Sequence, residues 1–257
     1  MSSIAVTGLA LTPVKGMRLR SVDKVDLVAD GAQGNRRFFV IDERDRMISG
    51  TALGSLCAVI ADYDASDDRL SLMFPDGTVV AAPVQIDGSL PVKFYSHTVE
   101  GQILAGPWSD ALSHHTSKRL RLVRRPGAVD RGRSGGASLI SRASLARLAQ
   151  AAGEPAVDAR RFRMLVEVDG ICAHEEDSWV GSTVQIGAAA VRFKGHVGRC
   201  MFTSRDPETG EVDLPTLDIL RDYRGEAVTT EPLPFGIYGE VVREGTVRLG
   251  DAVTAGQ

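Results

Sequence analysis

The chain has 257 residues, of which 43% are hydrophobic and 25% are charged, and its formal net charge is -3. These values are ordinary for globular proteins, and the length allows one large β domain or two smaller ones, each with its own core. The near-neutral balance gives no general attraction to nucleic acid or to an anionic membrane surface, so we expect neither as a partner.

The chain contains three cysteines, Cys57, Cys172 and Cys200. Their odd number and long spacings argue against a disulfide framework, and against a zinc or iron–sulfur site built from this chain alone. Such usage fits a reducing cytoplasm. No signal-peptide pattern opens the sequence and no apolar run approaches about 18 residues, so we predict a cytoplasmic protein without a membrane span.

Short runs of β-forming residues between turn signals dominate the first hundred residues. Pro75-Asp76-Gly77 predicts a hairpin turn between two such runs. A further apolar run, which includes Cys57, suggests core packing for that cysteine. The predicted strands are residues 4–12, 22–28, 38–41, 70–74, 78–82 and 92–99.

Helical patterns are scarcer, and the clearest one covers residues 141–152. Ser141 is a suitable N-cap, Leu145 and Leu148 share one face, and Gly153 is a suitable stop. Shorter helices are predicted at 108–116 and 215–223, and strands at 164–168, 183–186, 190–194, 235–242 and 246–253. Many short strands with few helices indicate a mainly β, barrel-like architecture with peripheral helices.

A stretch rich in Arg and Gly, residues 124–136, is the best candidate for a linker or an active-site loop. Its continuation through Ser138 toward Ser141 has backbone N–H groups and hydroxyls that could wrap an anion ahead of a helix. A plain linker is an equally good interpretation.

A series of short motifs in the second half resembles a MOSC (molybdenum cofactor sulfurase C-terminal) domain. The motifs that carry this resemblance are Arg161-Phe162-Arg163, Glu176-Asp177-Ser178-Trp179, Arg199-Cys200, Asp206-Pro207-Glu208-Thr209-Gly210, Tyr223-Arg224 and Phe235-Gly236.

Upstream, Pro13-Val14-Lys15 and Gly34-Asn35-Arg36-Arg37-Phe38 resemble the β-barrel module that precedes such domains. We therefore predict an N-terminal β-barrel module over residues 1–118 and a MOSC β-barrel domain over 119–257. This layout is similar to the mitochondrial amidoxime-reducing component and its bacterial relatives.

The resemblance implies reduction of a small N-oxygenated substrate at a molybdenum–pterin cofactor, with Cys200 as a metal ligand. It also implies that Lys15, Arg36 and Arg163 contact the cofactor, since guanidinium groups bind phosphate through paired hydrogen bonds. Electrons would come from a separate electron-transfer protein.

The residues around Cys200 suggest how its sulfur is tuned. Arg199 would lower the thiol pKa if both side chains face one cleft, and His196 could shuttle a proton near neutral pH. For a lone cysteine, however, a buried and inert role is the commoner fate.

Two other functions stay open. Leu165 replaces a family Asn, and Thr51 and Val197 stand where polar or cofactor-proximal groups are usual. These departures favour a metal-free sulfur carrier or C–S-bond enzyme, in which Cys200 takes a persulfide from a sulfur donor or attacks a substrate. A binding module without catalysis is the third possibility.

Overall fold

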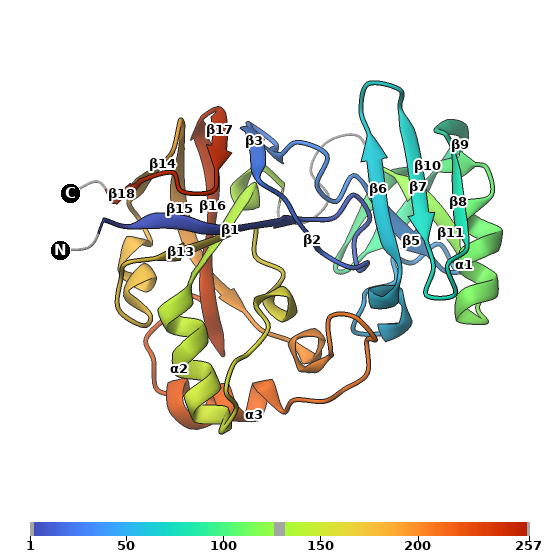
Figure 1. The fold of residues 1–257 in the computed structure, drawn as a ribbon. Coiled ribbons are helices and arrows are strands. Elements are labelled where there is room, and N and C mark those ends of the chain that lie inside the picture. The colour runs from blue at the N-terminus through green and yellow to red at the C-terminus, as the bar shows by residue number, and fades with distance from the viewer. Residues whose placement is uncertain (1–2, 126–131, 256–257) are drawn as a thin grey trace.

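The computed structural model describes residues 3–125 and 132–255, and it shows two lobes of β structure joined side by side (Figure 1). The larger lobe holds one sheet of eight strands, and its order combines the start of the chain with the second half. The strands in spatial order are β18 (Val253–Ala255), β14 (Thr183–Ile186), β15 (Ala189–Gly198), β16 (Pro234–Arg243), β12 (Ala137–Ser141), β13 (Val166–Asp169), β1 (Ala5–Leu11) and β2 (Arg20–Ser21).

The smaller lobe contains two further sheets, and a third small sheet borders the large one. Neighbouring strands of the described sheets pair antiparallel, except β12 and β13 of the large sheet, which run parallel. The orders are β5 (Phe38–Ile41), β11 (Arg121–Arg124), β10 (His97–Ala105) and β9 (Gln85–Phe94); β6 (Ile60–Asp64), β7 (Arg69–Met73) and β8 (Val79–Pro83); and β17 (Gly245–Arg248), β3 (Lys24–Val28) and β4 (Gly31–Ala32).

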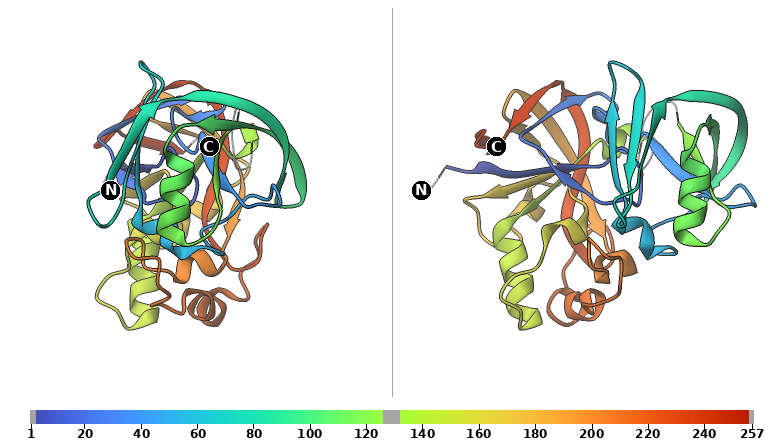
Figure 2. Two further views of the ribbon diagram at one scale, coloured as in Figure 1. Left: turned by 90° about the vertical axis from the view of Figure 1, so that its right-hand side faces the viewer. Right: turned by 45° about the vertical axis from the view of Figure 1, so that its right-hand side comes forward.

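Three α-helices lie on the periphery: α1 (Trp108–Thr116), α2 (Arg142–Ala152) and α3 (Thr216–Arg224). Helix α1 packs beside the small sheets, whereas α2 and α3 lie together below the large sheet (Figures 1 and 2). Within the two described ranges, none of the helices has the length and apolarity needed to cross a membrane. The predicted fold class, mainly β with peripheral helices, is confirmed.

Closed barrels do not form within the described residues, because the strand order of every sheet is open. The large sheet comes nearest to closure where Ala5 bridges Ala252 and the Val253 N–H donates to the Ile4 carbonyl at 2.9 Å. Two more backbone hydrogen bonds flank this bridge, from the Val6 N–H to the Asp251 carbonyl at 2.9 Å and from the Gly250 N–H to the Val6 carbonyl at 2.8 Å.

Two predicted strands are wrong because the chain reverses inside them. Residues 92–99 are the ends of β9 and β10, which turn at Tyr95 and Ser96. Tyr95 has φ 53 there, and an aromatic residue in the sequence does not predict a positive φ. Residues 246–253 likewise divide into β17 and β18, around a turn in which Gly250 has φ 85.

The predicted boundary at residue 118 stays a prediction. Strand pairing crosses it four times, because β1 pairs with β13, β3 pairs with β17, and β11 pairs with both β5 and β10. Each lobe nevertheless has its own hydrophobic cluster, one around Val166 and Phe193 and the other around Phe38 and Trp108.

Helix α2 begins as the sequence predicts, with the Ser141 hydroxyl accepting from the Ser144 N–H at 3.1 Å. Beneath this cap lies the fully buried carboxylate of Glu176. It accepts from the Ser141 N–H at 3.1 Å, the Ser141 hydroxyl at 2.9 Å and the Ser144 hydroxyl at 2.7 Å. Burial raises the pKa of Glu176, and these three donors work against that shift.

We expect Glu176→Ala to lower the free energy of unfolding by about 2–4 kcal/mol, because it leaves the buried donors at the start of α2 without an acceptor. Urea denaturation measures the change. The exposed Glu226→Ala is the matched control and should stay within about 0.5 kcal/mol of wild type. Equal destabilisation by the two variants would contradict a supporting role for the Glu176 carboxylate.

Candidate functional site

A cavity of about 510 Å³ opens where segments from both halves of the chain meet. Among the described residues that line it there is no Asp or Glu, whereas one Lys and four Arg are present. The lining residues are Lys15, Gly16, Arg36, Ser49, Gly50, Thr51, Tyr95, Gly135, Ser138, Arg161, Phe162, Arg163, Met164, Val197, Gly198, Arg199, Cys200, Phe202, Thr203 and Tyr238.

Cys200 lies at this cavity with its side chain exposed. Strand β15 ends at Gly198, and Cys200 starts the short 3-10 helix Met201–Ser204. The Cys200 carbonyl accepts from the Thr203 N–H and hydroxyl, both at 3.0 Å, which fixes the backbone beneath the sulfur. The Thr51 hydroxyl lies 3.5 Å from the Cys200 sulfur. By contrast, Cys57 is buried in the core as predicted, and burial raises the pKa of its thiol.

A hydrogen bond connects Arg36 to Arg163 at the cavity wall. Arg36 donates to the Arg163 carbonyl at 2.8 Å, and Arg163 donates to the Met17 carbonyl at 2.8 Å. Both residues adopt left-handed backbone, with φ 48 and φ 54. Such conformations are costly for non-glycine residues and persist where the surroundings enforce them, often at functional sites.

The Arg199 guanidinium is directed toward backbone carbonyls on the cavity wall. Its Nε donates to the Phe235 carbonyl at 2.8 Å and its Nη1 to the Phe162 carbonyl at 2.9 Å. Arg36 and Arg163 also donate to backbone carbonyls, so these contacts orient all three guanidinium groups at the cavity wall. Arg161 differs, because both its terminal nitrogens bind the Asp213 carboxylate at 2.6 Å.

The two walls of the cavity are joined through Arg205. Its Nη2 donates to the Thr51 carbonyl at 2.9 Å, and its Nη1 to the Gly210 carbonyl at 2.6 Å. Gly210, with φ 78, packs so closely on Gly54 that an added Cβ would lie 1.9 Å from the Gly54 carbonyl oxygen. The Asp206–Gly210 turn therefore docks the Cys200 segment against the loop that carries Thr51.

Comparison with known proteins identifies a domain in the second half of the chain. The MOSC domain matches residues 127–254. The chain belongs to the MOSC-domain family. It is 38% identical over 99 residues to human mitochondrial amidoxime reducing component 2, a match that covers 36% of this chain and 29% of that protein.

The bovine mitochondrial amidoxime reducing component 2 is 26% identical over 281 residues, covering 96% of this chain and 82% of that protein. A crystal structure of the YUAD protein from Bacillus subtilis aligns with 99% of this chain and 96% of its own at 14% identity, with a TM-score of 0.47.

Most of the residues predicted for the site line this one cavity: Lys15, Arg36, Ser138, Arg163, Arg199 and Cys200. Ser138 also accepts from the Leu165 N–H at 3.1 Å. Ser141 is not in the lining; it is fully buried as the cap of α2 and bound to Glu176. The predicted anion-binding loop cannot be compared in full, since residues 126–131 lie outside the described part of the MOSC domain.

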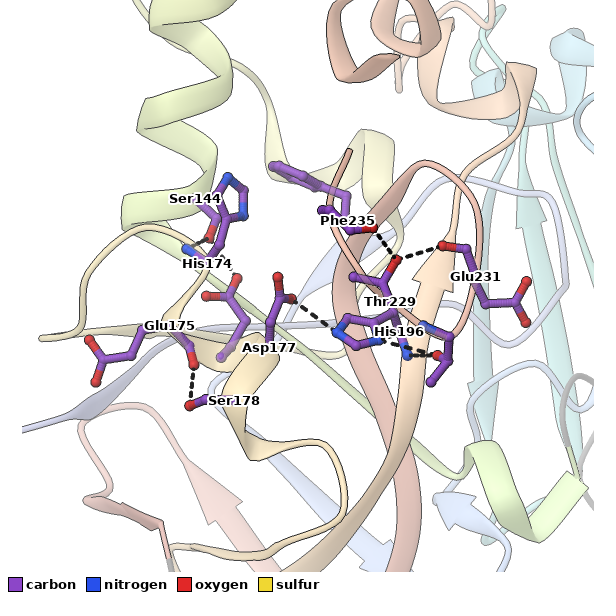
Figure 3. Close-up of polar contacts among 12 residues, drawn as sticks. Ser144, His174, Glu175, Asp177, Ser178, His196, Thr229, Glu231 and Phe235 are labelled. Carbon is purple, nitrogen blue, oxygen red and sulfur yellow. Dashed lines mark hydrogen bonds and ion pairs between the residues drawn. The ribbon is translucent and has the colours of Figure 1, made fainter. Parts of the chain in front are cut away.

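His196 is a buried residue of β15 that also lies outside the lining, and its ring faces Asp177 (Figure 3). The Thr230 N–H donates to its Nδ1 at 3.2 Å, which leaves the proton of the neutral ring on Nε2. That Nε2 points toward the Asp177 carboxylate at 3.7 Å, while Arg224 binds the other Asp177 oxygen at 2.7 Å. Burial lowers the pKa of His196. These contacts tie β15 to α3 and direct the imidazole away from the cavity lining.

Two aromatic residues of the lining, Phe202 and Tyr95, were not predicted from the sequence. Phe202 places its ring 5.0 Å from the Arg163 guanidinium, and Tyr95 places its ring 5.5 Å from the Lys15 ammonium. Phe202 follows the Arg-Cys motif by only two positions, which is a usable signal. Tyr95 lies in no motif, and only the fold brings it to the cavity.

The surroundings of His174 predict that the free energy of unfolding depends on pH. Burial, together with the positive charges of Arg224 and Arg147, lowers the pKa of His174 to about 4, and Asp177 opposes this shift only in part. Between about pH 6.5 and pH 4, His174 is therefore protonated in the unfolded chain and neutral in the folded protein. The free energy of unfolding falls as the pH falls through this range.

We expect His174→Asn to reduce this loss of stability, because Asn tolerates the left-handed backbone of residue 174 and cannot be protonated. Urea midpoints measured from about pH 7 to about pH 4.5 test it. The exposed His114→Asn should keep the wild-type slope. A wild-type slope in His174→Asn would show that another group drives acid destabilisation.

Proposed function

We propose that this MOSC-domain protein is an oxidoreductase that binds a molybdenum–pterin cofactor in the cavity and reduces a small N-oxygenated substrate. The observation that carries the proposal is the exposed Cys200 sulfur at the edge of a cationic cavity whose described lining contains no carboxylate. The relatives named amidoxime reducing component support the same class of reaction.

The residues present fit such a cofactor in size, charge and donor chemistry. A volume of about 510 Å³ lies within the usual range for cofactor and ligand cavities. A phosphate group carried by the cofactor would meet Lys15, Arg36 and Arg163, and the Ser138 hydroxyl stands on the same wall. A thiolate such as that of Cys200 is a preferred ligand for soft metals.

When bound, the molybdenum centre supplies oxygen-atom transfer coupled to a two-electron redox change. Reduction of an amidoxime to an amidine breaks the N–O bond, consumes two electrons and two protons, and releases the oxygen as water. A separate electron-transfer protein would supply the electrons.

Thr51 is a positioning residue in this proposal. Its hydroxyl lies 3.5 Å from the Cys200 sulfur, a contact that can hold the sulfur in place. Arg205 fixes the Thr51 backbone through its carbonyl. The contact between Thr51 and Cys200 therefore depends on the docking of the two halves of the chain.

A cytoplasmic location of the protein remains a prediction.

Molybdenum content provides the direct test. We expect wild-type protein from a cofactor-producing host to carry molybdenum and to reduce an amidoxime with a chemical electron donor. Cys200→Ala should lower both by roughly tenfold or more. Cys172→Ala removes another exposed cysteine, one outside the cavity lining, and should behave as wild type.

Wild-type protein with less than about a tenth of an equivalent of molybdenum, unchanged in Cys200→Ala, would contradict the proposal. The competing function is then metal-free sulfur transfer. Its support is that Leu165 is buried in the core and offers no polar group to the cavity. In that case incubation with a sulfur donor should add one sulfur atom to wild type and not to Cys200→Ala, as measured by intact mass.

A further inference from the structure

Tyr95 is set apart from every other aromatic side chain of the protein. All the Phe, Tyr and Trp residues belong to the described part of the chain, and Tyr95 alone among them is exposed. It has 59% of its surface open to solvent and still lines the cavity. When a planar molecule stacks on an exposed aromatic ring beside a ligand cavity, the ring surface is buried, which favours binding.

The β9–β10 hairpin brings Tyr95 to the cavity from the smaller lobe. Phe94 pairs with His97 across the turn, so Tyr95 and Ser96 are the two linking residues. The Phe94 ring meets the Tyr95 ring edge-on at 5.3 Å, and the Lys15 ammonium lies 5.5 Å from the Tyr95 ring centre. The Tyr95 ring therefore has a defined place next to one of the cationic groups of the cavity.

The two-residue turn of this hairpin calls for a positive φ, and Tyr95 is an unusual residue to adopt it. Tyr95 has φ 53, and two-residue hairpin turns with a positive φ favour Gly or Asn. An aromatic residue is among the least suited to this region. Because strained residues of this kind cluster at ligand sites, the use of Tyr here points to contact with a ligand.

We propose that Tyr95 is a specificity-determining residue that stacks on a planar, conjugated substrate at the mouth of the cavity. This inference rests on the proposed function and names the preferred substrate class: N-oxygenated groups attached to an aromatic ring. The proposed cofactor contacts Arg36 and Arg163 are only partly exposed, whereas Tyr95 is exposed at the entrance where a substrate must arrive. The smaller lobe thus contributes selectivity in addition to cofactor contacts.

The test compares benzamidoxime, which carries a phenyl ring, with acetamidoxime, which carries a methyl group. Equilibrium binding is measured by calorimetry on the cofactor-loaded protein without an electron donor. We expect Tyr95→Gly to weaken benzamidoxime binding roughly three- to tenfold, and acetamidoxime binding less than about twofold. Tyr95→Phe keeps the ring and should stay within about twofold of wild type for both ligands.

Folding and cofactor loading are checked in the same variants. Gly suits the positive φ at residue 95, so Tyr95→Gly should melt no lower than wild type. Equal effects on the two ligands, or none, would overturn the stacking role while acetamidoxime turnover shows that the proposed function holds. Loss of molybdenum in Tyr95→Gly would overturn it too, by assigning the ring to the cofactor. Absence of molybdenum and turnover in wild type would reject the proposed function and this inference together.

Discussion

The contact on which the site depends is the bridge that Arg205 makes between the two halves of the chain. One guanidinium group binds the carbonyl of Thr51, which lines the cavity, and the carbonyl of Gly210, in the turn that follows the Cys200 segment. Close packing of Gly54 on Gly210 leaves no room for a side chain at either position. With this junction in place, the Cys200 sulfur and the Thr51 hydroxyl come within 3.5 Å although 149 positions separate them.

The cavity is cationic, since its described lining contains one Lys and four Arg residues and no Asp or Glu. Arg36, Arg163 and Arg199 each donate to a backbone carbonyl, which holds the guanidinium group in place at the cavity. A cavity that gathers such charge without a carboxylate in its described lining is suited to an anionic ligand. An exposed thiol at its edge adds a ligand for a soft metal, and the two features together match a molybdenum–pterin group.

Local patterns in the sequence predicted local structure well. Helix α2 follows from the Ser141 cap and the Gly153 stop, both of which act within a few residues. The cationic residues of the cavity were predicted through motifs, and six of the eight predicted site residues line it. Ser141 and His196 do not. Ser141 is bound to the buried Glu176, and the His196 ring accepts from the Thr230 N–H, contacts that a motif does not reveal.

Features that depend on contacts between distant parts of the chain could not be predicted from the sequence. The turn at Tyr95 has no Gly or Pro to mark it, and its place at the cavity depends on the β9–β10 pairing and on Lys15, 80 positions earlier in the chain by residue number. The near closure of the large sheet likewise depends on contacts between the first and last described segments.

X-ray absorption at the molybdenum edge of the loaded protein tests the central claim most directly, because it reports the atoms bound to the metal. The account predicts a protein-derived sulfur neighbour in wild type and in Cys172→Ala, replaced by an oxygen neighbour in Cys200→Ser. Identical metal–sulfur coordination in wild type and Cys200→Ser would show that the cavity holds its cofactor without Cys200 and would contradict the account.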